Sequence, residues 1–219
     1  MKIDTSHPSP NHGPRVGADI SMLVLHATVG SYASALSWLC NPASKASTHY
    51  LISKTGYIYQ LVMDDRAAWH AGAAQWFDLD SGDIQRQSIG VELENRNDGH
   101  DPYPPAQFAS AAELCRSLIA RYAIVPDMVT RHLDIAIPHG RKTDPAGFRW
   151  AAFKAALFPP PIHRYRVRGL PVYEQSDRDG PLWGHLKNDE IIEIDDPANG
   201  HLKDHRGFIR FDPDTLEAV

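Results

Sequence analysis

The chain has 219 residues, with 22 basic and 27 acidic side chains and a formal net charge of −5 at pH 7. This length predicts one full domain and a small additional module. Hydrophobic residues at 42% and charged residues at 22% are ordinary for a globular protein and exclude a wholly disordered chain. The weakly acidic balance gives no electrostatic footprint for nucleic acid, and no run approaches the roughly 18 apolar residues that a membrane span requires. We therefore expect neither a nucleic-acid partner nor a membrane span.

The amino-terminal residues, the cysteines and the histidines indicate further properties of the chain. The first residues, MKIDTSHPSPNHGP, are polar and rich in proline, so we expect no secretory signal in this chain. Cys40 and Cys115 lie far apart and outside any CxxC motif, which predicts two separate buried side chains rather than a disulfide scaffold. The chain has 12 histidines, which justifies a search for a metal site or an acid–base cluster.

Three early segments carry strand patterns. Residues 22–28 (MLVLHAT) form a short apolar run with β-branched members, which predicts a buried strand. Residues 48–61 (THYLISKTGYIYQL) predict a hairpin that turns at residues 54–56 (KTG). Residues 88–95 (SIGVELEN) alternate between apolar and polar side chains, as a strand with two different faces does.

Two segments have helical periodicity. Residues 106–122 carry an apolar stripe from Phe108 to Tyr122, with prolines before and after it. Residues 148–158 (FRWAAFKAALF) are rich in alanine, and helical spacing predicts an apolar stripe of Phe148, Ala151, Ala152, Ala155 and Phe158. Strands interleaved with helices predict an α/β fold, a mixed β-sheet with flanking helices, over residues 1–158.

A proline-rich linker is predicted at residues 159–162, because three consecutive prolines favour a stiff extended spacer. Beyond it the helical period disappears. Residues 163–219 instead contain short strand-like runs broken by turn residues: RYRVRGLPVY, LWGHL, EIIEI and GFIRF. This pattern predicts a small all-β module.

Residues 131–145 concentrate ionisable side chains between two predicted helices, where catalytic groups commonly lie, although a solvated polar loop is an equal alternative. His26 lies inside an apolar strand and must be either a hydrogen-bonded core residue or a ligand. Two imidazoles and one carboxylate, with a fourth position left to water, are typical of catalytic zinc. His26, His132 and Asp144 would supply this set. Spacing alone does not choose Asp144 over Asp134, or His132 over His139.

Three further residues are candidates to act beside such a metal. Strand alternation places Glu92 and Glu94 on one face, and a carboxylate near a metal site could act as a general base for water. Two carboxylates on a solvated strand face are the ordinary alternative. Lys142 lies two residues before Asp144 and could stabilise a developing oxyanion, although a lone lysine is more often a surface residue.

Five blocks in the first 158 residues, in the same order along the chain, resemble the type 2 family of zinc N-acetylmuramoyl-L-alanine amidases. This family includes phage lysis amidases, cell-wall recycling amidases and animal peptidoglycan recognition proteins. The blocks are MLVLHATVG, STHYLISKTGYIYQLV, RAAWHAG, SIGVELEN and RHLDIAIPHGRKTDPAGF. Residues 163–219 are similar to bacterial SH3-like modules, which are small β-barrels. A small all-β domain that only shields one flank of the amidase is the alternative.

The amidase resemblance implies a role for each candidate. It implies one zinc ion per chain, with His26, His132 and Asp144 as the ligands. It also implies Glu92, rather than Glu94, as the catalytic acid–base and Lys142 as a transition-state stabiliser. His70 and Trp69 would lie near the cleft and are tentative substrate-binding residues.

Two departures from the family pattern bear on loop shape. The family often has glycine where this chain has Arg131, and the usual Pro-Gly after the aspartate is here Pro145-Ala146-Gly147. Neither change touches a reacting group. Binding-only members of the family lose the third ligand, so the carboxylate at Asp144 favours an enzyme.

The resemblance implies a zinc hydrolase that cleaves the amide bond between N-acetylmuramic acid and L-alanine, with peptidoglycan or a muropeptide as substrate. Three alternatives stay open: an inactive peptidoglycan-binding protein, a recycling amidase for soluble muropeptides, and a zinc peptidase that cuts within the peptide stem. A phage lysis enzyme of this kind would be made in the cytoplasm and would act at the cell wall.

Overall fold

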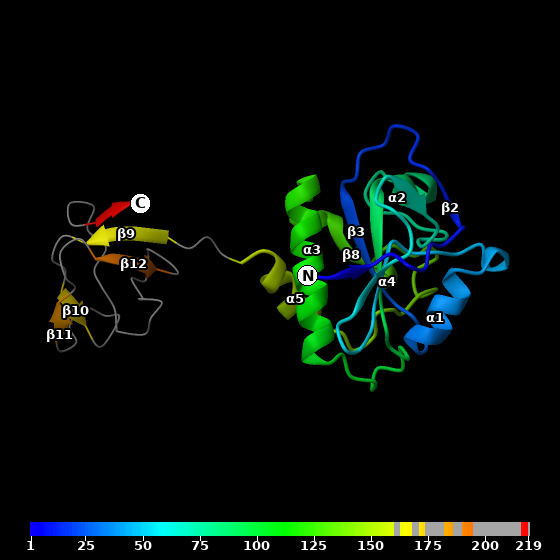
Figure 1. The fold of residues 1–219 in the computed structure, drawn as a ribbon. Coiled ribbons are helices and arrows are strands. Elements are labelled where there is room, and N and C mark those ends of the chain that lie inside the picture. Colours follow the sequence, from blue (N-terminus) through cyan, green and yellow to red (C-terminus); the bar gives the residue numbers. More distant parts are fainter. Residues whose placement is uncertain (160–162, 168–170, 174–181, 186–189, 195–215, 219) are drawn as a thin grey trace. The chain divides into compact units, whose positions relative to one another are not determined.

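A computed structural model describes residues 1–159, 163–167, 171–173, 182–185, 190–194 and 216–218 (Figure 1). The chain divides into two units, Met1–Phe158 and Pro159–Val219. None of the helices in the described part of the chain is long and apolar enough to cross a membrane.

A six-stranded mixed sheet forms the centre of the first unit. Across the sheet, the strands follow the order β1 (Ile3–Asp4), β5 (Ile58–Gln60), β4 (Tyr50–Ile52), β7 (Ser88–Leu93), β3 (Met22–Ala27) and β8 (Val129–Arg131). The four strands β4, β7, β3 and β8 run parallel to one another, and β5 pairs antiparallel with β4. The predicted α/β fold with a mixed sheet is therefore confirmed, as is the hairpin, which β4 and β5 form.

Two helices, α3 (Pro105–Tyr122) and α5 (Trp150–Leu157), cover one face of this sheet (Figure 1). The main hydrophobic core lies between them and the strands. It includes Leu23, Leu25, Ile89, Val91 and Leu93 from the sheet, Ala112, Cys115 and Leu118 from α3, and Phe153 and Leu157 from α5. Both predicted helices are present, and α3 buries its predicted apolar stripe. The stripe predicted for the second helix is wrong: α5 leaves Ala151, Ala152 and Ala155 exposed and buries Phe153 and Leu157 instead.

The opposite face carries α1 (Tyr32–Leu39), α2 (Ser81–Gln87) and the short α4 (His132–Ile135) (Figure 1). Met22 and Val24 of β3 pack there against Ile84 of α2 and Ile135 of α4. Because successive side chains of a strand point to opposite faces, His26 belongs to this second face together with Met22 and Val24. The second face therefore holds the candidate site.

Smaller elements complete the unit. β2 (His12–Pro14) and β6 (Arg66–Ala68) form a two-stranded antiparallel sheet, and two 3-10 helices span Pro42–Ser44 and Pro126–Met128. The segment predicted as a loop from residue 131 differs from that expectation. Its first residue ends β8, and α4 follows at once from His132, so the second candidate histidine begins a helix.

Most of the described residues of the second unit lie in strands. β9 (His163–Val167) pairs antiparallel with β12 (Ile191–Ile194) and β13 (Leu216–Ala218), and β10 (Pro171–Tyr173) pairs with β11 (Leu182–His185). Most of the segments that would close the predicted SH3-like barrel lie outside the described residues. The barrel therefore stays a prediction.

Candidate active site

Three neighbouring parallel strands bring the candidate residues to one edge of the sheet. His26 of β3 is the register partner of Glu92 of β7. On the other side of β3, Leu25 pairs with Arg131, so His132 follows at the level of His26. The carboxyl ends of parallel strands are where open α/β sheets commonly place their sites. Residues that are far apart in the sequence are thus gathered by strand register.

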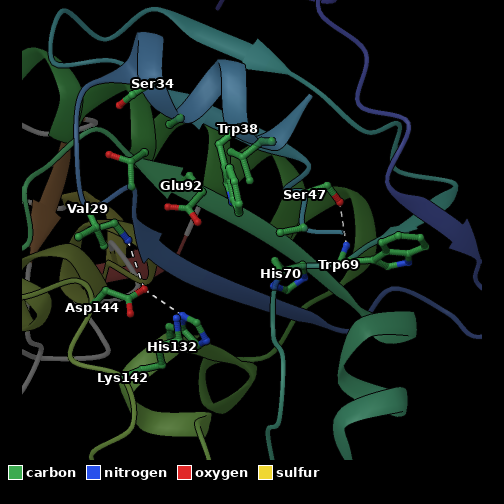
Figure 2. A pocket seen from close by; sticks show the side chains of 15 residues that line it. Val29, Ser34, Trp38, Ser47, Trp69, His70, Glu92, His132, Lys142 and Asp144 are labelled. Atoms are coloured by element: carbon green, nitrogen blue, oxygen red, sulfur yellow. Dashed lines mark hydrogen bonds and ion pairs between the residues drawn. The ribbon is translucent and has the colours of Figure 1, made fainter. Parts of the chain in front are cut away.

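A group of three buried side chains could hold a metal ion. One donor atom from each of His26, His132 and Asp144 lies within 4.8 Å of the others. The Nδ1 atom of His132 lies 3.0 Å from Oδ2 of Asp144, and the Nδ1 atom of His26 lies 3.6 Å from the same oxygen. Figure 2 shows Asp144 and His132 at one end of the pocket, facing each other. Both imidazoles therefore present the same ring nitrogen toward one carboxylate.

The alternatives left open by spacing lie elsewhere. Asp134 accepts hydrogen bonds from the Arg131 guanidinium at 2.8 Å and from the Arg131 backbone N–H at 3.0 Å. These hydrogen bonds cap the amino terminus of α4. His139 is exposed to solvent. Neither residue belongs to the buried group. Arg131, which departs from the family pattern, also stacks over the ring of Trp150 at 5.3 Å.

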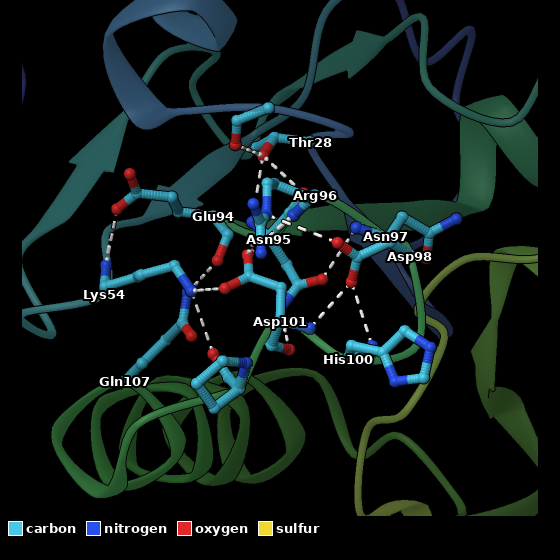
Figure 3. A network of polar contacts seen from close by, with 12 residues as sticks. Thr28, Lys54, Glu94, Asn95, Arg96, Asn97, Asp98, His100, Asp101 and Gln107 are labelled. Carbon is cyan, nitrogen blue, oxygen red and sulfur yellow. Dashed lines mark hydrogen bonds and ion pairs between the residues drawn. The ribbon is translucent and has the colours of Figure 1, made fainter.

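A polar network holds the loop that carries Asp144. Asn97 accepts a hydrogen bond from the backbone N–H of Ala146 at 2.7 Å and donates one to Oγ1 of Thr143 at 2.9 Å. Its own loop, which follows β7, is braced by Asp101, whose carboxylate accepts from Lys54 Nζ and from the backbone N–H of Arg96 (Figure 3). The backbone of Asn97 is left-handed, with φ at 58°, a conformation that asparagine adopts more readily than most residues. Asp144 is thus fixed from both sides of its loop.

Glu92 and Glu94 have different surroundings. β7 ends at Leu93, and the carboxylate of Glu94 accepts hydrogen bonds from the backbone N–H groups of Tyr32 at 3.0 Å and Lys54 at 2.7 Å. Glu92 lines the pocket instead, and its buried Oε2 has no hydrogen-bond partner among the described residues. Of the two glutamates, Glu92 is therefore the one whose carboxylate is available to a molecule bound in the pocket.

Burial shifts the pKa values of the side chains in the candidate site and so sets their charge states. It raises the pKa of Glu92 to about 8, the nearby Asp144 adds to this rise, and Lys142 opposes it. Burial, reinforced by His132, lowers the pKa of His26 to about 4. Burial alone would raise the pKa of Asp144, but the neighbouring imidazoles of His132 and His26 outweigh it and hold that pKa well below its usual range. At neutral pH the site thus offers a neutral His26 and an ionised Asp144.

The pocket beside this group has a volume of about 490 Å³. Two tryptophans form parts of its wall: Trp38 of α1, with 58% of its surface exposed, and Trp69, with 36% exposed (Figure 2). The half-buried Lys142 also lines the pocket, close to Asp144. Of the tentative substrate-binding residues, Trp69 therefore lines the wall, and His70 lines the pocket but is almost fully buried.

Sequence reasoning missed two contributors to the wall. Trp38 lies on α1, a helix that was not predicted. Ser47 accepts a hydrogen bond from the backbone N–H of Trp69 at 2.8 Å and so holds the segment that carries this tryptophan. The only sequence signal for α1 is Ser31, whose side chain accepts from the backbone N–H of Ser34 and caps the helix.

The donor set suits a zinc ion. Two imidazole nitrogens and one carboxylate oxygen, buried and converging on one point, match the three protein ligands of many catalytic zinc sites. The unpartnered Glu92 oxygen next to this group fits a fourth position that water or substrate would occupy.

Residues 16–147 match the model of the N-acetylmuramoyl-L-alanine amidase family, and the chain belongs to this family. The matched region contains all the candidate residues described above. Over 164 residues the chain is 35% identical to the N-acetylmuramoyl-L-alanine amidase AmiD of Escherichia coli (strain K12), which covers 68% of this chain and 56% of that protein.

A second relative is the 1,6-anhydro-N-acetylmuramyl-L-alanine amidase AmpD of Salmonella typhimurium (strain SL1344). It is 40% identical over 116 residues, which cover 52% of this chain and 58% of that protein. The chain thus spans little more than half the length of these curated relatives. A solved complex of E. coli AmiD with the substrate anhydro-N-acetylmuramic acid-L-Ala-D-gamma-Glu-L-Lys matches with a TM-score of 0.57 and 32% identity, covering 69% of this chain and 61% of that one.

Proposed function

We propose that this chain is a zinc-dependent amidase that cleaves the bond between N-acetylmuramic acid and L-alanine in peptidoglycan. One observation carries the proposal. In a chain of this family, the buried group of His26, His132 and Asp144 lies beside a pocket that is also lined by Glu92, whose buried Oε2 has no hydrogen-bond partner among the described residues. A binding-only protein has no need for a buried carboxylate without a partner, because such a group costs stability.

His26, His132 and Asp144 would hold the zinc ion and take no other part in the reaction. Zinc bound there would polarise the scissile carbonyl and lower the pKa of water. The ionised state of Asp144 and the neutral state of His26 are the forms that bind a cation.

Glu92 would move the protons. Its carboxylate would take a proton from the attacking water and return it to the amine of the departing L-alanine. Burial raises the pKa of Glu92 in the metal-free site, and a zinc cation beside it would lower that pKa again, which favours the carboxylate form that accepts a proton. Lys142 would place its ammonium group beside the oxyanion that develops on the carbonyl.

Trp38 and Trp69 would contact the substrate. Aromatic walls bury much apolar surface at little cost in side-chain entropy, and both tryptophans line the same pocket. The polymer and a soluble anhydro-muropeptide would present the same bond there. The AmpD resemblance favours the soluble substrate as a second candidate, whereas a wall-binding module in the second unit would favour the polymer.

Mass spectrometry of the products tests the proposal. Purified protein is incubated with intact peptidoglycan and, separately, with a soluble anhydro-muropeptide. The proposal predicts that every new amino terminus is L-alanine. A new terminus at another stem residue would identify a peptidase instead, and binding without any cleavage would identify an inactive binding protein. The ratio of the two rates distinguishes the two substrates.

A further inference from the structure

His70 lies directly behind His26, on the side away from Asp144. The Nδ1 atom of His70 lies 3.1 Å from Nε2 of His26, and its Nε2 atom lies 3.0 Å from Oγ of Ser88. The Ser88 hydroxyl in turn donates to the backbone carbonyl of Ile84. All four residues are buried, so no water competes for these hydrogen bonds.

The carbonyl at the end of this chain sets the direction of every hydrogen bond in it. A carbonyl only accepts, so the single Ser88 proton points to Ile84. Ser88 must then accept from His70, which places the His70 proton on Nε2. A neutral imidazole with its proton on Nε2 accepts at Nδ1, so His26 donates from its own Nε2. The lone pair of His26 is therefore on Nδ1, the nitrogen that lies 3.6 Å from Asp144.

A glycine of β7, Gly90, makes room for the His70 ring. Gly90 lies under the imidazole, and a Cβ added to Gly90 would come within 2.6 Å of Cγ and 2.7 Å of Cδ2 of His70. Any larger residue at position 90 would therefore push the ring out of place. Glycine is therefore required at this position of the SIGVELEN block, because it lets the His70 ring lie against the strand backbone.

Ala71, the residue after His70, orients the second imidazole of the group, that of His132. The Nε2 atom of His132 lies 3.2 Å from the backbone carbonyl of Ala71, so His132 also donates from Nε2 and presents Nδ1 to Asp144. One segment, His70–Ala71, therefore orients both imidazoles of the group. Side chains or carbonyls that accept the distal N–H of a metal-bound histidine typically contribute strongly to metal affinity.

We propose that His70 is a positioning residue that fixes the tautomer and ring orientation of His26, with Ser88 holding His70 in the accepting state. The inference rests on the proposed zinc site. In this role His70 does not ligate the ion and acts through His26, from a place at the wall of the pocket.

Zinc affinity of the full chain, measured by competition with a chelator, tests this role in three variants. His70→Leu fills similar space without an acceptor and should weaken zinc binding by roughly 10- to 100-fold. His70→Asn keeps an oxygen near the position of Nδ1 and should recover most of that loss. Gly90→Ala changes no polar group but displaces the ring, so it should also weaken binding.

His49 supplies the matched control. It is as buried as His70 and packs against it, with ring centroids 5.8 Å apart, but it accepts from the backbone N–H of Gly90 and does not contact His26. His49→Asn should therefore lower the melting temperature without a comparable loss of zinc affinity. A folded His70→Leu protein that binds zinc as tightly as the wild type would overturn the inference.

Nitrogen NMR of the metal-free wild-type protein provides a second, independent readout. It should show His26 and His70 protonated at Nε2 and bare at Nδ1, and finding the opposite His26 tautomer would also overturn the inference. If the wild type shows these tautomers but binds no zinc, the proposed zinc site fails while the hydrogen-bond relay stands. If the wild type binds zinc and the variants bind it equally well, only the role of His70 fails. Should His70→Leu not fold, Gly90→Ala and the tautomer assignment still decide.

Discussion

At the scale of single residues, hydrogen bonding separates two glutamates that the strand pattern could not rank. Both oxygens of Glu94 are used by backbone amides, which tie α1 and the β4–β5 hairpin to the end of β7. Glu92 keeps one buried oxygen free beside the histidines. The first arrangement serves the fold, and the second suits chemistry.

This difference predicts opposite outcomes for two matched substitutions. Glu92→Gln keeps the shape of the side chain and removes its basicity, so turnover should fall by roughly 10²- to 10⁴-fold while zinc content and melting temperature persist. Glu94→Gln leaves turnover nearly intact but should destabilise the fold by about 1–3 kcal/mol, because an amide NH₂ would face a backbone N–H. The measurements are the rate of amine release, the zinc content and the melting temperature. Near-normal turnover in Glu92→Gln beside an inactive, zinc-replete Glu94→Gln would reverse the assignment.

The choice of metal-binding residues could not be made from spacing for a related reason. Asp134 and Asp144 both follow His132 closely in the sequence, and only the capping of α4 by Arg131 and Asp134 removes the first from consideration. The pairing of β8 with β3 brings His132 level with His26, and this pairing joins segments about a hundred residues apart. Local sequence patterns do not encode such contacts, so the family resemblance had to select the set.

At the scale of elements, the strands and helices with a long apolar period were predictable. β3, β7 and α3 bury their repeating apolar residues in the main core, so pattern and structure agree. α1 and α2 have only 8 and 7 residues, and each depends on a side-chain cap, Ser31 or Asp80, and on packing against the sheet. Helices this short are marginal without tertiary contacts, which explains why sequence periodicity did not reveal them.

The packing of α3 on the sheet makes its cysteine a probe. Cys115 is fully buried, and burial raises the pKa of its thiol to about 12, whereas Cys40 is half-buried and the pKa of its thiol is raised by partial burial. A raised pKa means less of the reactive thiolate at a given pH. At pH 8 a thiol reagent should therefore modify Cys40 slowly and Cys115 only after unfolding.

Counting the modified thiols over time, with and without denaturant, checks this expectation. The chain has only 2 cysteines, so each site can be followed separately by mass spectrometry of peptides. Equal rates at both sites in the folded protein would show that α3 does not pack on the sheet as described.

At the scale of the whole molecule, the first unit contains both the core and the candidate site. We propose that residues 163–219 form an SH3-like module, and we test whether this module engages the cell wall. A protein ending at Phe158 should then cleave a soluble anhydro-muropeptide at nearly the full rate, because all the described residues that line the pocket belong to the first unit. Its activity on insoluble peptidoglycan should drop.

The two substrates measured side by side separate the alternatives for the module. Full activity of the shortened protein on both would mean that residues 163–219 do not recruit the enzyme to the wall. Loss of both activities, with a lower melting temperature, would instead show that these residues support the fold of the first unit.

The central claim is that the buried histidines and aspartate hold a zinc ion on which amide cleavage depends. The most direct measurement follows the release of L-alanine amino termini from peptidoglycan by the same preparation in three states: as purified, after chelation to a verified metal-free form, and after one equivalent of zinc is returned. We predict that activity is lost in the second state and restored in the third. Full activity in the metal-free protein would contradict the account.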